Sequence, residues 1–215
     1  MNILIGDIGN SVAKICLVEA NNFKLKKIFY LDSNKILSKK HLTIFLKKII
    51  KKKLIFKTAL FASVVPVYKN ILKKTLIKNY GIRLKEIKDK KINKIVKINI
   101  KKKNQIGSDR IANAVGVFKK YQKDCIVVDF GTATTFDVIT KKGIYNGGII
   151  APGINISIKS LISSADQLPD FLLKKPDKIV GKNTTEALSS GFYWGYVGLV
   201  NNIIFKIEEE TRKKY

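Results

Sequence analysis

Hydrophobic and polar positions follow two different periods in the first half of the chain. The run NILIGDIGNSVAKICLVE, interrupted by a Gly-Asn pair, predicts two strands joined by a hairpin turn over residues 2–19. Over residues 39–53, large apolar residues instead recur at helical spacing among lysines, which predicts an amphipathic helix. The same comparison predicts a strand at 25–31, a buried strand at 58–66 that ends at Pro66, and a helix at 68–80.

The second half of the chain has clearer elements than residues 82–103, which hold only short strand-like pieces between lysines. A serine and an aspartate after Gly107 predict a capped helix start. The last predicted helix carries small residues at spacings that permit close helix packing, namely Ser190, Gly191, Gly195 and Gly198. The expected elements are a helix at 108–121, a strand, turn and strand at 125–140, a strand within 144–153, and helices at 154–168 and 184–214.

Composition favours one large or two small globular domains, since 46% of the 215 residues are hydrophobic. No run approaches the roughly 18 apolar residues of a membrane span, so no membrane partner is expected. The N-terminus lacks the pattern of a signal peptide. Cys16 and Cys125 lie singly in apolar runs, which favours free thiols in a reducing cytoplasm. His41, the only histidine, lies at a predicted surface helix start, and no Cys/His set suits zinc.

The net charge of +26 comes almost entirely from lysine. Lysines are scattered through nearly every segment, and Arg83, Arg110 and Arg212 are the only arginines. A nucleic-acid-binding protein tends to gather its charge on one face and to use arginine for bidentate contacts. The pattern therefore favours lysine at solvated positions and no nucleic-acid partner. The alternative is long-range attraction of anionic substrates.

Two turns of one kind recur about half a chain apart. Residues 5–10 read IGDIGN and residues 127–132 read VVDFGT, so each apolar strand ends in Asp, any residue, Gly and a short polar residue. This weak internal repeat predicts an α/β fold with two similar lobes that face each other across a cleft.

The composition of these turns suits phosphate binding. A carboxylate at a strand end can hold Mg²⁺ together with phosphate oxygens and water. The following glycine lets a polyphosphate approach the backbone, and the exposed turn amides form an anion-binding cradle. Lys14 could add a point charge from the returning strand. Either turn alone could be an ordinary strand end, but the pair favours phosphate chemistry.

A third candidate, Gly107-Ser108-Asp109-Arg110, lies between the two turns. Asp109 is expected in the first turn of a helix, where it could serve only as a cap. The competing hypothesis is a general base that accepts a hydroxyl proton during phosphoryl transfer. Arg110 is a planar cation in a chain that otherwise uses lysine, which favours recognition of a carboxylate or phosphate.

Six segments in order resemble the type III pantothenate kinases. They are DIGNSVAK at 7–14, SVVP at 63–66, GSDR at 107–110, DFGTATTFD at 129–137, GGIIAPG at 147–153 and GKNTTEALSSG at 181–191. The resemblance implies an α/β fold of two actin-like (ribonuclease H-like) lobes with an active-site cleft between them. The lobes would comprise residues 1–106 and 107–215, the second shortened at its C-terminus.

The resemblance also implies a reaction and a set of site residues. The family transfers the γ-phosphate of ATP to the 4′-hydroxyl of pantothenate, the first step of coenzyme A synthesis. It uses Mg²⁺ with K⁺ or NH₄⁺, and its members are usually homodimers. Asp109 would accept the proton, Asp129 would bind the monovalent cation and Asp7 would bind Mg²⁺. The residues implied to bind ATP are Asp7, Ile8, Gly9, Asn10, Ser11, Val12, Ala13, Lys14 and Thr132, and those implied to bind pantothenate are Gly107, Ser108, Asp109, Arg110 and Thr184.

The sequence departs from the family pattern in three places. Ile100 lies about where a pantothenate-contacting tyrosine is usual. The family continues after its long helix to another strand and helix, whereas this sequence stops at Tyr215, so ATP is expected to bind more loosely and with less selectivity. Asn10-Ser11 replaces the common Asn-Thr, a change that keeps the hydroxyl.

Two other functions remain open from the sequence. A phosphotransferase or phosphatase of the same fold, acting on another small substrate, would keep both turns but has no reason to keep GSDR and GKNTTEALSSG together. A non-enzymatic accessory role in transcription would leave Asp7, Asp109 and Asp129 free to be lost. All three are present in a chain with only 16 acidic residues.

Overall fold

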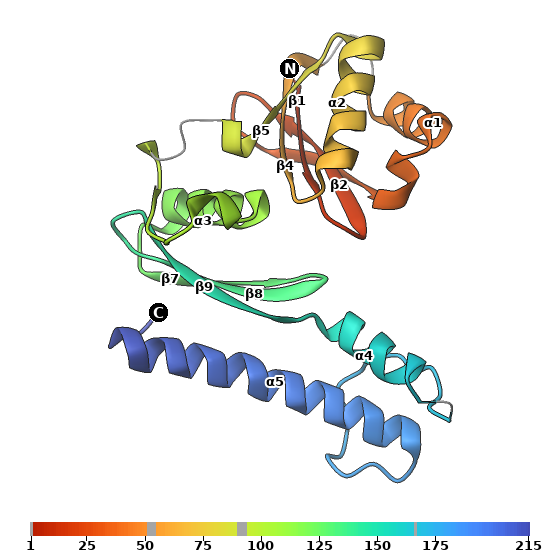
Figure 1. Ribbon diagram of the computed structural model, residues 1–215, viewed down its shortest axis with the longest axis vertical. Coiled ribbons are helices and arrows are strands. Elements are labelled where there is room, and N and C mark those ends of the chain that lie inside the picture. The colour runs from red at the N-terminus through yellow and green to blue at the C-terminus, as the bar shows by residue number, and fades with distance from the viewer. Residues whose placement is uncertain (1, 51–54, 90–93, 166) are drawn as a thin grey trace. The chain divides into compact units, whose positions relative to one another are not determined.

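The computed structural model describes residues 2–50, 55–89, 94–165 and 167–215 (Figure 1). The chain divides into two compact units. The first comprises Met1–Gln122 with Lys142–Tyr145, and the second comprises Lys123–Lys141 with Asn146–Tyr215. The predicted lobe boundary between residues 106 and 107 is a different division and stays a prediction.

The first unit is built on a five-stranded sheet with the order β3-β2-β1-β4-β5. β1 pairs antiparallel with β2 and parallel with β4, so the hairpin lies next to a crossover connection. The predicted hairpin, third strand and buried fourth strand are confirmed. The strands are β1 (Asn2–Ile8), β2 (Val12–Glu19), β3 (Leu25–Asp32), β4 (Ile55–Ser63) and β5 (Arg83–Glu86).

Helices α1 (Lys39–Ile49) and α2 (Pro66–Tyr80) complete the core of the first unit. Pro66 lies at the start of α2, where its missing N–H costs no helical hydrogen bond, and Gly81 ends the helix with a φ of 66°. α1 ends before the predicted residue 53, and residues 51–54 lie outside the described ranges. The core joins buried side chains of the sheet and both helices, including Leu4, Ile15, Phe61, Leu42, Leu46, Leu72 and Leu76.

Between β5 and α3 (Ser108–Tyr121) the chain forms only short elements, as predicted. β6 (Lys97–Ile98) pairs in parallel with the first residues of β9, Ile144 and Tyr145. This pairing explains why residues 142–145 belong to the first unit. Short 3₁₀ helices of this unit include Ser33–Ile36, Ile87–Asp89 and Lys103–Gln105.

The second unit contains β7 (Cys125–Phe130), β8 (Ala133–Ile139), most of β9 (Ile144–Pro152), α4 (Ile154–Ser163) and α5 (Thr184–Thr211). β8 lies between β7 and β9. α5 runs along these strands (Figure 1), and Ile207 packs with Phe136 and Val138 in a buried core.

Two predicted helix ends in the second unit are wrong. α4 was expected to reach residue 168, but it ends at Ser163. The hydroxyls of Ser163 and Ser164 both donate to the Ser160 carbonyl, so side chains compete with the backbone at this end. α5 ends at Thr211 instead of 214, because Arg212 adopts a left-handed φ of 53°.

Neither cysteine is in a disulfide, and both Cys16 and Cys125 are half-buried. Within the described ranges, no helix is both long enough and apolar enough to cross a membrane.

Candidate active site

The first Asp-x-Gly turn connects β1 to β2 at one end of the five-stranded sheet. Asp7 and Lys14 lie directly opposite each other in the hairpin, so both side chains are on the same face. Asp7 is half-buried, whereas Lys14 is exposed. The Gly9 N–H donates to the Val12 carbonyl at 3.1 Å and closes the turn. The Asp7 carboxylate and the Lys14 side chain therefore lie on one face of the hairpin where the strand ends.

A fully buried serine outside the turn stabilises it through two hydrogen bonds. The Ser33 hydroxyl donates to the Gly9 carbonyl at 2.7 Å, and the Ser33 N–H donates to the Ser11 carbonyl at 2.9 Å. Asn10 and Ser11 themselves are exposed. Sequence analysis missed Ser33, because nothing in the local pattern distinguishes it from an ordinary loop serine.

Gly6, next to Asp7, is required by a close approach inside the sheet. A Cβ at this position would lie 2.2 Å from the Phe61 ring and 2.9 Å from the Lys14 carbonyl. The Phe61 ring is completely buried. The strand that carries Asp7 is therefore pressed tightly against β4.

The Gly107–Arg110 motif begins α3, but its cap differs from the prediction. Gly107 is the N-cap residue and makes no side-chain capping bond, so the predicted Ser/Asp cap is wrong. Asp109 lies inside the first turn, where its Oδ1 accepts a hydrogen bond from the Arg110 N–H at 2.8 Å. A Cβ on Gly107 would lie 2.2 Å from that oxygen. Glycine thus leaves room for the half-buried carboxylate to fold back over the helix start.

The end of β4 contacts both motifs of the first unit. The Val64 N–H donates to the Ile8 carbonyl at 3.2 Å, and the Ser108 hydroxyl lies 3.1 Å from the Ser63 carbonyl. Val64 Cγ1 is also 3.6 Å from the place where a Gly107 Cβ would lie. The SVVP segment therefore connects the Asp7 turn to the helix start that carries Asp109.

Arg110 lies near an aromatic ring of the same unit. Its guanidinium carbon lies 5.9 Å from the centroid of the buried Tyr145 ring, which is cation–π distance. Ile100, at the position where the family usually has tyrosine, is half-buried in a bend after β6.

The second Asp-x-Gly turn connects β7 to β8 in the second unit. Asp129 is half-buried and lies directly opposite Thr135, so their side chains share one face. The Gly131 N–H donates to the Ala133 carbonyl at 3.0 Å, and Thr132 is exposed at the tip. This turn has no lysine opposite its aspartate.

The backbone at the start of α4 supports this second turn. The Gly153 N–H donates to the Thr132 carbonyl at 3.0 Å. A Cβ at Gly153 would lie 2.3 Å from the Gly131 oxygen and 2.4 Å from the Thr132 oxygen. Glycine at the end of the GGIIAPG segment is therefore needed for this contact, a role that the sequence pattern did not reveal.

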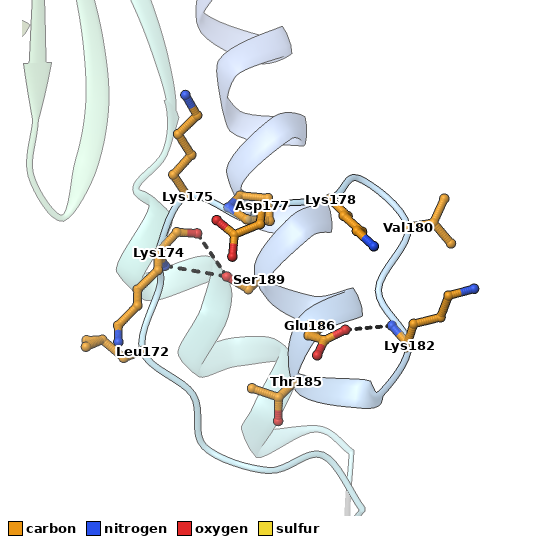
Figure 2. Close-up of a pocket in the computed structure, with 11 residues that line it drawn as sticks. Leu172, Lys174, Lys175, Asp177, Lys178, Val180, Lys182, Thr185, Glu186 and Ser189 are labelled. Atoms are coloured by element: carbon orange, nitrogen blue, oxygen red, sulfur yellow. Dashed lines mark hydrogen bonds between the residues drawn. The ribbon is translucent and has the colours of Figure 1, made fainter.

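Thr184 is exposed as the first residue of α5, after the N-cap residue Asn183. An open cavity of about 610 Å³ lies beside this helix end (Figure 2). The Glu186 carboxylate accepts from the Lys182 N–H at 2.8 Å, while Ser189 is bonded to the Lys174 backbone. Lys175 and Lys182 extend in different directions (Figure 2), so these two lysines do not converge on one ligand position.

The two turn aspartates fit metal ions of different kinds. Within the described ranges, no three His, Cys, Asp or Glu residues gather into a metal site. Mg²⁺ commonly takes one or two carboxylates with phosphate and water, so the single Asp7 fits a site completed by a nucleotide. Thr135 Oγ1 is buried without a hydrogen-bond partner among the described residues. Because Thr135 faces Asp129, it fits as a second oxygen ligand for a monovalent cation.

Comparisons with known proteins identify the family. The type III pantothenate kinase family matches residues 3–206. The type III pantothenate kinase of Pelagibacter ubique is 43% identical over 99% of this chain and 84% of its own length. That of Koribacter versatilis is 52% identical over 50% of this chain and 39% of its own length.

One solved structure also matches most of the chain. A conserved Campylobacter jejuni protein, described as a Baf family transcriptional activator, has a crystal structure that matches with a TM-score of 0.55 and 25% identity. The match covers 94% of this chain and 79% of that one. The predicted α/β class is confirmed, since both units combine strands with helices, and the actin-like assignment stays what the family resemblance implies. The chain belongs to the type III pantothenate kinases, ATP-dependent kinases that phosphorylate pantothenate for coenzyme A synthesis.

Proposed function

We propose that Asp109 accepts the proton of the pantothenate 4′-hydroxyl while that hydroxyl attacks the γ-phosphate of ATP. The supporting observation is the β4 end, which contacts both the Asp7 turn through Ile8 and the start of α3 through Ser108. A base and a phosphate-binding turn supported by one strand end suit in-line phosphoryl transfer, where positioning supplies much of the rate.

Residues 7–14 and Thr132 hold the nucleotide in this proposal. The exposed Asn10 and Ser11 face solvent at the turn, where a triphosphate can reach them. Lys14 supplies a positive charge beside Asp7, which lowers the cost of gathering anionic oxygens there.

Asp7 holds Mg²⁺, and Asp129 with Thr135 holds K⁺ or NH₄⁺. When bound, these cations neutralise charge on the phosphates. The chain itself places one carboxylate near the end of each strand, Asp7 in β1 and Asp129 in β7, next to the turn that follows.

Pantothenate binds at Gly107–Arg110, with the Arg110 guanidinium facing its carboxylate and Thr184 as a further contact. We place the reaction in the cytoplasm, in a homodimer, without a nucleic-acid or membrane partner. The dimer proposal draws on α5. A Cβ added to Gly191, Gly195 or Gly198 would meet nothing within 4 Å in the described part of the chain, so this face has room for a second helix.

The test is Asp109→Asn, assayed with ATP, Mg²⁺, K⁺ and radiolabelled pantothenate. Asparagine keeps the shape and can still accept from the Arg110 N–H, so the fold is expected to persist. We expect kcat to fall by roughly 10²–10⁴-fold, the usual contribution of a general base. Asp124→Asn is the matched control, because Asp124 also accepts a backbone N–H, from Lys141 at 2.9 Å. A kcat near that of the unmodified enzyme would reduce Asp109 to a structural residue.

A further inference from the structure

Three side chains from three elements of the first unit are hydrogen-bonded to one another at the start of α3. Glu86, the last residue of β5, is 7% exposed. Its Oε2 accepts from Lys69 Nζ of α2 at 2.6 Å, and its Oε1 accepts from the Ser108 hydroxyl of α3 at 2.5 Å. We call Lys69, Glu86 and Ser108 the Glu86 cluster. Sequence analysis singled out neither Lys69 nor Glu86.

The geometry satisfies a buried charge and fixes a direction. A carboxylate taken out of water is costly unless it is paired and hydrogen-bonded, and here each oxygen has its own donor. Apolar residues of similar size often stabilise a protein as well as a buried ion pair does. What an ion pair adds is a hydrogen-bonded arrangement with one orientation, because both partners lose their bonds if either moves.

The cluster acts on the turn that carries Asp109. Ser108 is 1% exposed and precedes Asp109 directly, and its hydroxyl lies within hydrogen-bond distance of both Glu86 and the Ser63 carbonyl. Gly107, the N-cap residue, makes no side-chain capping bond. The Ser108 hydroxyl is therefore a side-chain tether of this helix start to the ends of β4 and β5.

We propose that Glu86 is a positioning residue for catalysis: with Lys69 it holds Ser108, and through Ser108 it fixes where the Asp109 carboxylate lies. This inference rests on the proposed role of Asp109 as proton acceptor. Lys69 compensates the buried charge of Glu86, Glu86 accepts from the Ser108 hydroxyl, and this second bond determines where the first turn of α3 lies.

Three variants separate positioning from stability. Ser108→Ala removes the tether. Lys69→Met/Glu86→Met removes the acceptor and leaves no unpaired buried charge. Lys69→Met/Glu86→Gln also removes both charges but keeps an oxygen that accepts from Ser108. The control is Lys26→Met/Glu19→Gln, which breaks a 3.1 Å lysine–glutamate pair of the same sheet, away from the turn.

We expect Ser108→Ala and the double methionine variant to lower kcat by roughly ten- to hundredfold, the scale of a small misplacement of a catalytic group. KM for ATP should change little, because the cluster supports the residue next to Asp109, the proposed base, and not the turn proposed to bind ATP. The Lys69→Met/Glu86→Gln variant should keep most of the kcat, as should the control. Melting temperatures of the same variants will show whether kcat falls with stability or with the loss of the acceptor for the Ser108 hydroxyl.

Each result decides the inference. If Ser108→Ala and the double methionine variant melt earlier but keep their kcat, the cluster serves stability alone and the inference is wrong. The same holds if the glutamine variant loses as much kcat as the methionine variant. If the methionine variant does not fold, Ser108→Ala against Lys69→Met/Glu86→Gln makes the same decision. An active Asp109→Asn would instead overturn the proposed role of Asp109, a failure visible without any cluster variant.

Discussion

The two Asp-x-Gly turns share a sequence pattern but differ in what faces the aspartate. Across the first hairpin Asp7 faces Lys14, whereas across the second Asp129 faces Thr135. An ammonium group beside the carboxylate suits a turn that gathers phosphate oxygens. A carboxylate with a buried hydroxyl oxygen suits a turn that binds a cation. In our proposal, the residue opposite the aspartate distinguishes the two turns, with Lys14 in the phosphate-binding turn and Thr135 in the cation-binding turn.

The turns also differ in what supports them. In the first turn, the buried Ser33 hydroxyl donates to the Gly9 carbonyl, and the Ser33 backbone N–H donates to the Ser11 carbonyl. In the second, the Gly153 backbone packs directly against the Gly131 and Thr132 carbonyls. The hydroxyl bond from Ser33 can be removed by substituting one side chain. At the second turn, the backbone of Gly153 lies so close that even an added Cβ would not fit. The two turns should therefore respond differently to mutation.

The largest expected difference is between Asp7→Asn and Asp129→Asn. Removing the Asp7 charge should lower kcat by roughly 10²-fold or more in any salt, as losing one preorganised electrostatic contact does. Asp129→Asn should instead abolish the difference between K⁺ and Na⁺ buffers. Rates measured in K⁺, NH₄⁺ and Na⁺ check both statements.

Thr135→Val sharpens this test, because valine keeps the shape and removes the oxygen that faces Asp129. We expect it to weaken K⁺ activation while leaving the Na⁺ rate unchanged. Equal rates in K⁺ and Na⁺ for the unmodified enzyme, together with a harmless Asp129→Asn, would contradict the cation assignment.

The next effect concerns stability. Gly153→Ala places a Cβ 2.3 Å from a backbone oxygen, whereas Gly9→Ala places one 3.1 Å from the Val12 carbonyl. Overpacking against backbone that cannot rotate away typically costs about 1–3 kcal/mol. The first substitution should therefore lower the free energy of unfolding by that amount, and the second by less. Urea unfolding of both variants measures the difference, and equal losses would show that the contacts at the two turns are equivalent.

The sequence predicts features that depend on neighbouring residues better than features that depend on residues far apart in the chain. Apolar periodicity is local, so it located both hairpins, β4 and α2. It does not determine helix ends, because α4 stops where the hydroxyls of Ser163 and Ser164 donate to the Ser160 carbonyl, a competition that periodicity does not record.

The site divides in the same way. The motif residues were found because each motif is contiguous in sequence. Their supports were not, since Ser33 reaches Gly9 across 24 positions and Glu86 reaches Ser108 across 22. Such pairs are brought together by the strand order β3-β2-β1-β4-β5, which no short segment specifies.

Ser33→Ala should have a smaller effect than the glycine substitution, and on the first turn alone. The variant leaves the Gly9 carbonyl without its hydroxyl donor, a loss of about 1 kcal/mol. If the turn binds ATP phosphates, KM for ATP should rise roughly fivefold, which is that energy expressed as affinity. Ser190→Ala is the control, because this buried serine also donates to a backbone carbonyl, that of Ile179. An unchanged KM for ATP with a lowered stability would separate Ser33 from the nucleotide.

The smallest effect lies at the opposite ends of the hairpins, where each carries one acidic residue. The pKa of Asp124 is lowered chiefly by the hydrogen bond from the Lys141 N–H, whereas the pKa of Glu19 is lowered by the exposed Lys26 side chain. A depressed pKa means that the stabilisation is present above the unfolded value, about 3.9 for aspartate, and is lost as pH falls through the folded value. The difference in unfolding free energy between the unmodified protein and Asp124→Asn should therefore shrink as pH falls from about 5 to about 2.

For Glu19→Gln, 1 M salt should remove the effect, because salt screens exposed ion pairs but not a backbone hydrogen bond. If salt removes both effects alike, the Lys213 ammonium, 3.3 Å from Asp124, and not the backbone amide, is the group that sets the acid stability of the second hairpin.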